Sequence, residues 1–293
     1  MSFHVTNIYG NTALTDKGYK ADYGNAFIIE SDGRKILYDT GWKGDILLHN
    51  FQTAGIDPDS IDILVFSHGH FDHTGGLKEF LQSRTKNKPL QVFLHPDALK
   101  KKHASFIARV IMTLKLKEKI KDFGFTELPE NLKDKITFEF ITDTHEIIKG
   151  LYSLGEITER PEKDATQFLL QKDNDNDKWG KDMVMDDLSL VCETKNGLAL
   201  ICGCCHAGIL NTLKKIEKQW PGKNIEAIIG GTHMMIFKKE DLENISTNLK
   251  KNHNTPKLYL NHCSGEKTIT YFKDVFGDEI TKPMHVGDSM KIE

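Results

Sequence analysis

The chain has 293 residues, of which 39% are hydrophobic and 28% charged, and its net charge is −3. This composition indicates a globular protein with a sizeable core, and the acidic balance without a dense basic run argues against a nucleic-acid partner. The start MSFHVTNIYGNTAL lacks the pattern of a signal peptide, and no run of about 18 apolar residues predicts a membrane span. The odd set of five cysteines fits reduced thiols, so we expect a cytoplasmic protein.

The first third of the chain is typical of a β-hairpin followed by alternating strands and helices. Residues NAFIIE and KILYDTG flank a polar turn, and IDILVF is a continuous apolar run of the kind found in strands buried on both faces. We therefore expect strands at 25–30, 35–41, 61–66 and 90–95, and helices at 44–55 and 75–83.

The rest of the chain repeats this plan after a different segment. Residues 97–125 predict one long or broken amphipathic helix, inserted above the sheet. Strands are then expected at 135–142, 188–194, 197–203, 225–231 and 256–263, with helices at 207–220 and 239–252. No linker or low-complexity tract interrupts the sequence, so we treat 1–293 as one domain in which helices cover the outer faces of sheets.

The segment FSHGHFDHTGG, directly after the buried strand at 61–66, carries the strongest chemical signal. On an extended segment, His68 and His70 point to the same side and can hold one ion, while the turn at Gly75 and Gly76 lets Asp72 and His73 serve a second. Imidazole and carboxylate groups suit Zn²⁺, and two adjacent ions lower the pKa of a shared water. Four ligand-type residues at this spacing predict a metal site rather than a polar loop.

His68-x-His70-x-Asp72-His73 behind a strand resembles the signature of the metallo-β-lactamase superfamily. KILYDTG, YSLGEITER, MDDLSLVCETKNGLALICGCCHAGILNTL, IGGTHM and NHCSG are similar to segments of one subgroup. That subgroup is labelled 7,8-dihydropterin-6-methyl-4-(β-D-ribofuranosyl)-aminobenzene-5'-phosphate synthase or metal-dependent hydrolase. The resemblance implies an α/β fold, a four-layer αββα sandwich with two mixed sheets, and a metal site at one edge between them.

The resemblance also implies further ligands at the ends of later strands. His262 is in the place of a ligand of the second ion, with a buried, hydrogen-bonded histidine as the alternative. Many family members have Gly-Asp where this chain has Gly203-Cys204, so the bridging carboxylate is missing. Either His206 completes the first ion's ligands without a protein bridge, or Cys204 supplies a thiolate; we favour His206, with Cys204 in a supporting position.

Two further residues have a functional and a structural interpretation. Asp39 is in the place of a buried carboxylate that orients a ligating histidine, or else it is a turn residue before Gly41. His233 follows an apolar strand and two glycines, where it contacts substrate or donates a proton to the leaving group, unless its role is structural.

We expect a metal-dependent hydrolase that uses a metal-bound water or hydroxide on a small ester or phosphate-containing substrate. Two divalent ions are expected, with Zn²⁺ ahead of Mn²⁺ or Fe, and Asp72 also orients the attacking water. The alternatives are a transferase like the dihydropterin synthase of the subgroup, and a non-catalytic metal- or ligand-binding module. The partner is a small molecule, and the sequence leaves the oligomeric state open.

Overall fold

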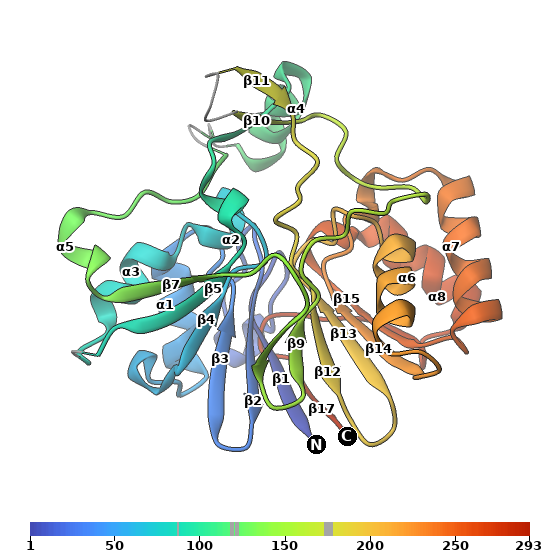
Figure 1. The fold of residues 1–293 in the computed structure, drawn as a ribbon, viewed down its shortest axis with the longest axis horizontal. Helices are drawn as coiled ribbons and strands as arrows, with labels where there is room; N and C mark the ends of the chain where they lie inside the picture. The colour runs from blue at the N-terminus through green and yellow to red at the C-terminus, as the bar shows by residue number, and fades with distance from the viewer. Residues whose placement is uncertain (87, 118–119, 121–122, 173–177) are drawn as a thin grey trace.

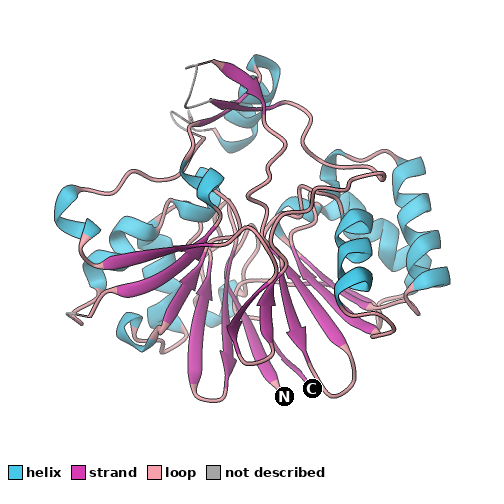
Figure 2. Ribbon diagram, viewed as in Figure 1, coloured by secondary structure: helices cyan, strands magenta, loops and turns pink. Residues whose placement is uncertain are grey.

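The computed structural model describes residues 1–86, 88–117, 120, 123–172 and 178–293. Figure 1 shows two sheets packed against each other, with helices on the outer face of each. Figure 2 shows the same four layers by element type, and a smaller unit of strands and one helix above the sandwich. The expected αββα architecture is confirmed.

The first sheet has an antiparallel half and a parallel half. In the described residues it has the order β17-β1-β2-β3-β4-β5-β7, with β1, β2, β3 and β17 antiparallel and β3, β4, β5 and β7 parallel. The predicted hairpin is present, since Phe27 pairs with Tyr38. The strands are β1 (Phe3–Tyr9), β2 (Ala26–Ser31), β3 (Arg34–Tyr38), β4 (Ile63–Val65), β5 (Leu90–Leu94), β7 (Ile136–Phe140) and β17 (Ser289–Ile292).

The second sheet repeats this mixed plan. Its order in the described chain is β16-β15-β14-β13-β12-β9-β8, with β13 to β16 parallel and β8, β9, β12 and β13 antiparallel. Its strands are β8 (His145–Ile148), β9 (Leu151–Ser153), β12 (Leu190–Glu193), β13 (Leu198–Cys202), β14 (Ile225–Gly230), β15 (Lys257–Leu260) and β16 (Thr281–Pro283).

Helices of the two halves cover opposite outer faces of the sandwich (Figure 1). Those beside the first sheet are α1 (Gly44–Thr53), α2 (Phe71–Thr74), α3 (Leu77–Ser83) and α5 (Glu130–Lys133). Those beside the second sheet are α6 (Ile209–Gln219), α7 (Lys239–Asn252) and α8 (Glu266–Phe276). Short 3-10 turns lie at Thr15–Lys17, Pro58–Ser60, Pro96–Leu99, Met234–Ile236 and His262–Ser264.

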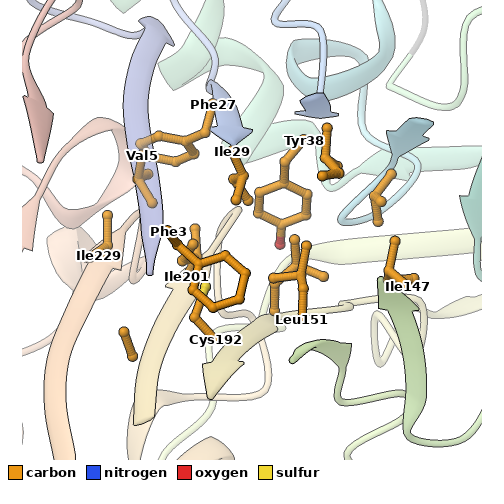
Figure 3. Packing of buried hydrophobic residues seen from close by; sticks show 14 of the residues in the cluster. Phe3, Val5, Phe27, Ile29, Tyr38, Ile147, Leu151, Cys192, Ile201 and Ile229 are labelled. Carbon is orange, nitrogen blue, oxygen red and sulfur yellow. The ribbon is translucent and has the colours of Figure 1, made fainter. Parts of the chain in front are cut away.

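The central core lies between the two sheets. Figure 3 shows Phe27, Ile29 and Tyr38 of the first sheet facing Cys192 and Ile201 of the second. Two further apolar clusters lie between each sheet and its own helices. Burial of apolar area on both faces explains why the central strands read as continuous apolar runs. This rigid sandwich holds the strand ends that carry the metal-ligand candidates.

The segment expected to be a helical insertion is only partly helical. α4 (Phe106–Leu116) is an amphipathic helix as predicted, but β6 (Lys102–Ala104) precedes it and pairs with β10 (Leu169–Lys172), which in turn pairs with β11 (Trp179–Lys181). Positions 118, 119, 121 and 122 of the expected insertion lie outside the described residues. The strand at β6 was missed because three residues show no periodicity, and pairing with a distant segment decides their conformation.

Among the described residues, the structure contains no helix that is both long and apolar enough to cross a membrane.

Candidate metal centre

The motif loop connects β4 to the short helix α2. His68 and His70 lie on the extended segment after β4, and Asp72 and His73 lie in α2, so the chain turns between the two pairs as the spacing predicts. Gly69 allows the loop to pass close to the backbone of Ala98, since a Cβ there would be 2.0 Å from the Ala98 carbonyl oxygen. The loop is therefore fixed at the edge of the sandwich.

His68, His70 and His206 come together as one group. The ring centroid of His68 is 4.5 Å from that of His70 and 4.9 Å from that of His206, and the rings of His70 and His206 are 5.1 Å apart. All three side chains are buried. His206 lies between the end of β13 and the start of α6. This position brings its ring beside the motif histidines His68 and His70.

Asp72, His73 and His262 form the adjacent group. Asp72 Oδ2 is 3.4 Å from His262 Nε2 and 3.9 Å from His73 Nε2. His262 lies in the turn after β15 with a left-handed backbone (φ 47°), a conformation that a non-glycine residue adopts only where the surroundings enforce it. The structure therefore brings His206 and His262 close to the motif loop at residues 68–73.

Cys204 lies between these two groups and not behind them. The ligand atoms of His68, Cys204 and His206 lie within 4.8 Å of one another, and so do those of His73, Cys204 and His262. Cys204 Sγ is 3.2 Å from His73 Nε2. Cys263, which the sequence analysis did not single out as a site residue, is 3.3 Å from Cys204 Sγ. Cys204, expected in a supporting position, therefore has its Sγ close to ligand atoms of both groups.

Asp39 occupies the supporting position expected of it. Its Oδ2 accepts a hydrogen bond from His73 Nδ1 at 2.6 Å and another from Ser67 Oγ at 2.7 Å. Its Oδ1 accepts one from the Ser67 backbone N–H at 2.7 Å. The carboxylate thereby fixes the tautomer of His73, whose Nε2 is left to face the site.

Burial keeps the histidines of the first group neutral. Desolvation lowers the pKa of His68 and of His206 well below its usual range, and burial together with the Lys102 charge lowers the pKa of His70 to about 3. Burial opposes ionisation of Asp72, but the neighbouring His73 and His262 hold the pKa of its carboxyl below its usual range. Neutral imidazoles beside an ionised carboxylate are the forms that bind metal ions.

A buried cluster of ion pairs is hydrogen-bonded to the backbone of the motif loop. Lys102 Nζ donates to Asp186 Oδ1 at 2.8 Å and to Asp182 Oδ2 at 2.9 Å. Asp186 Oδ2 accepts from the Gly69 backbone N–H at 2.7 Å, between the two motif histidines. Sequence reasoning missed Lys102, because nothing in a lysine at the start of a mixed segment indicates partners about 80 residues away.

His233 lies at the border of the site. Its ring is 4.3 Å from that of His206, and its backbone N–H donates to Cys263 Sγ. Its Nδ1 is buried and has no hydrogen-bond partner among the described residues. Cys204, His233 and Cys263 also have ligand atoms within 4.8 Å of one another. The residue is therefore placed to meet a substrate or an ion.

The chemistry of this donor set fits divalent metal ions. The Nε2 atoms of His68, His206 and His262 are buried and make no hydrogen bond in the part of the chain that the structure describes, and that of His262 lies 3.4 Å from Asp72 Oδ2. Buried imidazole nitrogens are normally paired, and a bound cation would satisfy all three. Nitrogen, carboxylate and thiol donors together match the preferences of Zn²⁺ and related ions.

Comparisons with known proteins identify the family of the chain. A family model described as the metallo-beta-lactamase superfamily matches residues 19–159. The 7,8-dihydropterin-6-methyl-4-(beta-D-ribofuranosyl)-aminobenzene-5'-phosphate synthase of Methanocaldococcus jannaschii is 31% identical over 98% of this chain and 97% of its own length. The chain belongs to the metallo-β-lactamase superfamily.

Solved structures of the superfamily support the same assignment. The crystal structure of Tm1679, described as a metal-dependent hydrolase of the beta-lactamase superfamily, matches with a TM-score of 0.77 and 25% identity, over 99% of this chain and 98% of its own. YhfI from Bacillus subtilis, at 10% identity and a TM-score of 0.55, shares the fold over 99% of both chains. The family resemblance stated from the motifs is confirmed.

Proposed function

We propose that the chain is a metal-dependent enzyme acting on small molecules. The observation that carries this proposal is the convergence of buried, unpaired imidazole nitrogens beside Asp72 and Cys204. The proposed ligands form two sets: His68, His70 and His206 for one ion, and Asp72, His73 and His262 for the other. When bound, such ions activate a nucleophile and polarise the atom under attack.

Cys204 is proposed as a thiolate shared by both sets. The resemblance to the superfamily implies an aspartate at this position, and Cys204 Sγ is close to ligand atoms of each group. Burial raises the pKa of the Cys204 thiol, so a thiolate here requires a cation beside it. Thiolate together with imidazole ligands favours zinc over Mn²⁺.

The reaction that the comparisons favour is group transfer of the synthase type. The Methanocaldococcus relative matches over nearly the full length of both chains, including the segments that supply His206 and His262. On this basis we propose a transferase that joins two small ring-containing substrates. The sequence predicts such a transferase as the alternative to a hydrolase, and the similarity to the synthase makes it the first candidate.

Hydrolysis is the second candidate, favoured by the structural match to a protein described as a metal-dependent hydrolase. Both reactions would use the same residues of this chain. Asp72 orients the nucleophile, and His233, with its buried unpaired Nδ1, moves a proton at the substrate. In hydrolysis, water is the nucleophile. In the transfer, an amine of one substrate attacks a carbon of the other, and a group bonded to that carbon, such as a phosphate, leaves with the bonding electrons.

The test combines metal analysis with product analysis. We expect about two ions per chain in the purified protein, and clear losses in the Asp72→Ala and His206→Ala variants. The metal-loaded protein is then incubated with ribofuranosylaminobenzene phosphate and a dihydropterin that carries a leaving group, such as a phosphate, on its 6-methyl carbon. Ester, lactone and phosphodiester panels are tested separately. Coupled product without hydrolysis supports the transferase, and turnover of a panel member alone supports the hydrolase. A full metal complement with no turnover in either assay refutes both in favour of a binding module, and unchanged metal content in the variants contradicts the ligand sets.

A further inference from the structure

A cavity of about 260 Å³ lies directly over the proposed metal ligands. His70, Asp72, Cys204 and His206 form its floor, and His233 stands at its side. The small unit above the sandwich supplies much of its wall, through α4 and the segment before β10 (Figure 1). The aromatic and larger aliphatic side chains of its lining include Tyr23, Phe71, Ile107, Ile111, Phe123 and Phe168.

One wall of this cavity is aromatic and fixed by packing. Phe71 follows the motif histidine His70, and its ring is 5.6 Å from that of Phe123 and 6.4 Å from that of Tyr23. Phe71 and Phe123 are almost fully buried. A stacked substrate ring would find a preformed surface here, since aromatic pairs favour centroid separations of this order.

The opposite wall comes from α4 and is aliphatic. Ile107 and Ile111 lie one helical turn apart, and they are 65% and 58% exposed although both line the cavity. Exposed apolar patches mark contact surfaces for ligands, proteins or membranes, and these two side chains line the cavity over the proposed metal ligands. Phe168, 57% exposed, extends the same surface.

Charged groups contribute little to this lining. Among the described residues that line the cavity, Asp72 is the carboxylate, and no lysine or arginine occurs. Lys102 lies nearby but is committed to Asp182 and Asp186. Against the apolar walls, away from the proposed metal ligands, burying an unpaired ionic group of a substrate would be costly.

We propose that the apolar walls of this cavity receive an uncharged aromatic ring of the substrate, held by apolar contact. The cavity exceeds the roughly 150 Å³ of an apolar cavity that holds benzene, so one ring or a fused pair fits. A benzene-like ring fits better than a pterin, whose many polar atoms would lose hydrogen bonds to water. This assignment rests on the proposed function, because the metal ligands form the floor of the cavity.

The test measures ring binding separately from turnover. The metal-loaded full chain is titrated with neutral 2-naphthalenemethanol by ligand-observed NMR, and 4-ethylaniline and pterin are then compared as competitors. We expect saturable binding, with displacement by 4-ethylaniline at about tenfold lower concentration than by pterin. The Ile111→Lys variant should bind the probe about tenfold more weakly. Val110→Lys is the matched control, since Val110 is on the same helix, is 43% exposed and does not line this cavity.

The assignment is overturned if pterin competes as well as 4-ethylaniline, if no saturable binding occurs, or if both lysine variants lose the probe equally. Because Ile111 is exposed, its replacement leaves the fold intact, which circular dichroism checks. Ring binding without any turnover would refute the proposed function and leave the cavity assignment standing. Turnover by a chain that prefers pterin in competition would refute only the cavity assignment.

Discussion

Asp39 Oδ2 accepts a hydrogen bond from His73 Nδ1 at 2.6 Å, and the opposite nitrogen of the same ring lies 3.2 Å from Cys204 Sγ. The pair joins the end of β3 to the motif helix α2. This hydrogen bond fixes the orientation of the His73 ring relative to the first sheet.

Replacing Asp39 by asparagine should therefore weaken metal binding. The substitution keeps the size of the side chain but removes the charge that holds His73 in its ligating tautomer. Loss of such a partner typically costs about tenfold to a hundredfold in metal affinity. Competition with a chromophoric chelator measures this, and Asp278→Asn, whose side chain is 81% exposed, serves as the control. Equal affinities for the Asp39 variant and the wild type would show that the pair has no role in metal binding.

Cys204 gives a spectroscopic prediction. The cobalt-substituted wild type should show a sulfur-to-cobalt charge-transfer band in the near ultraviolet, and Cys204→Ala should lose it. Cys192→Ala is the matched control, because Cys192 is buried in the core between the sheets. A band that persists in the Cys204 variant would assign the thiolate to Cys263 instead, and no band in the wild type would exclude a thiolate ligand.

Lys102 gives a stability prediction. Lys102→Met leaves Asp182 and Asp186 buried without their cation, which should lower the free energy of unfolding by about 3 to 5 kcal/mol. It should also lower metal affinity, since Asp186 accepts from the Gly69 backbone N–H. Urea unfolding measures the first effect. Lys133→Met, at an exposed ion pair, should unfold like the wild type. An unfolding midpoint for Lys102→Met equal to that of the wild type would contradict the prediction.

Asp187 gives a pH prediction for the metal-free protein. Burial raises the pKa of its carboxyl to about 6, although the Ala207 backbone N–H opposes this. Between pH of about 4 and 6, the folded state thus holds a proton that the unfolded state has lost. The contribution of Asp187 to the free energy of unfolding therefore falls as the pH rises. Asparagine does not ionise, so Asp187→Asn should remove this fall in the free energy of unfolding.

Urea unfolding at pH values across this window tests the sign. The free energy of unfolding of the variant minus that of the wild type should rise by about 2 to 3 kcal/mol from the lower to the upper end of the window. This value corresponds to a shift of about two pKa units. Parallel pH profiles for the two proteins would mean that Asp187 ionises normally in the folded state.

The sequence predicted the parts of the site that lie close together in the chain or at strand ends. His68, His70, Asp72 and His73 are separated by a few residues, and the strand-to-helix turn that orients them is visible in the apolar pattern. His206 and His262 follow apolar strands, a position that places them at the same sheet edge. The structure brings these six side chains close together, and their role as metal ligands stays a prediction.

Other features depend on contacts that no local pattern encodes. Cys263 and Cys204 are 59 residues apart, and their proximity follows from the alignment of β13 and β15 on either side of β14. The helical periodicity of α4 was visible, but β6 acquires its strand conformation only from β10. β1 and β17 were missed for the same reason, because each is stabilised largely by pairing with a segment elsewhere in the chain.

The pairing of β1 with β17 sets Phe3 opposite Ile292, so the ends of this chain lie side by side (Figure 1). During synthesis, the edge of β1 that pairs with β17 therefore has no partner until residues 289–292 have emerged. An open strand edge invites pairing with other chains, and contacts of such long sequence separation form slowly. Recombinant yield should accordingly rise at low temperature, where the nascent first half is less prone to aggregate before β17 arrives.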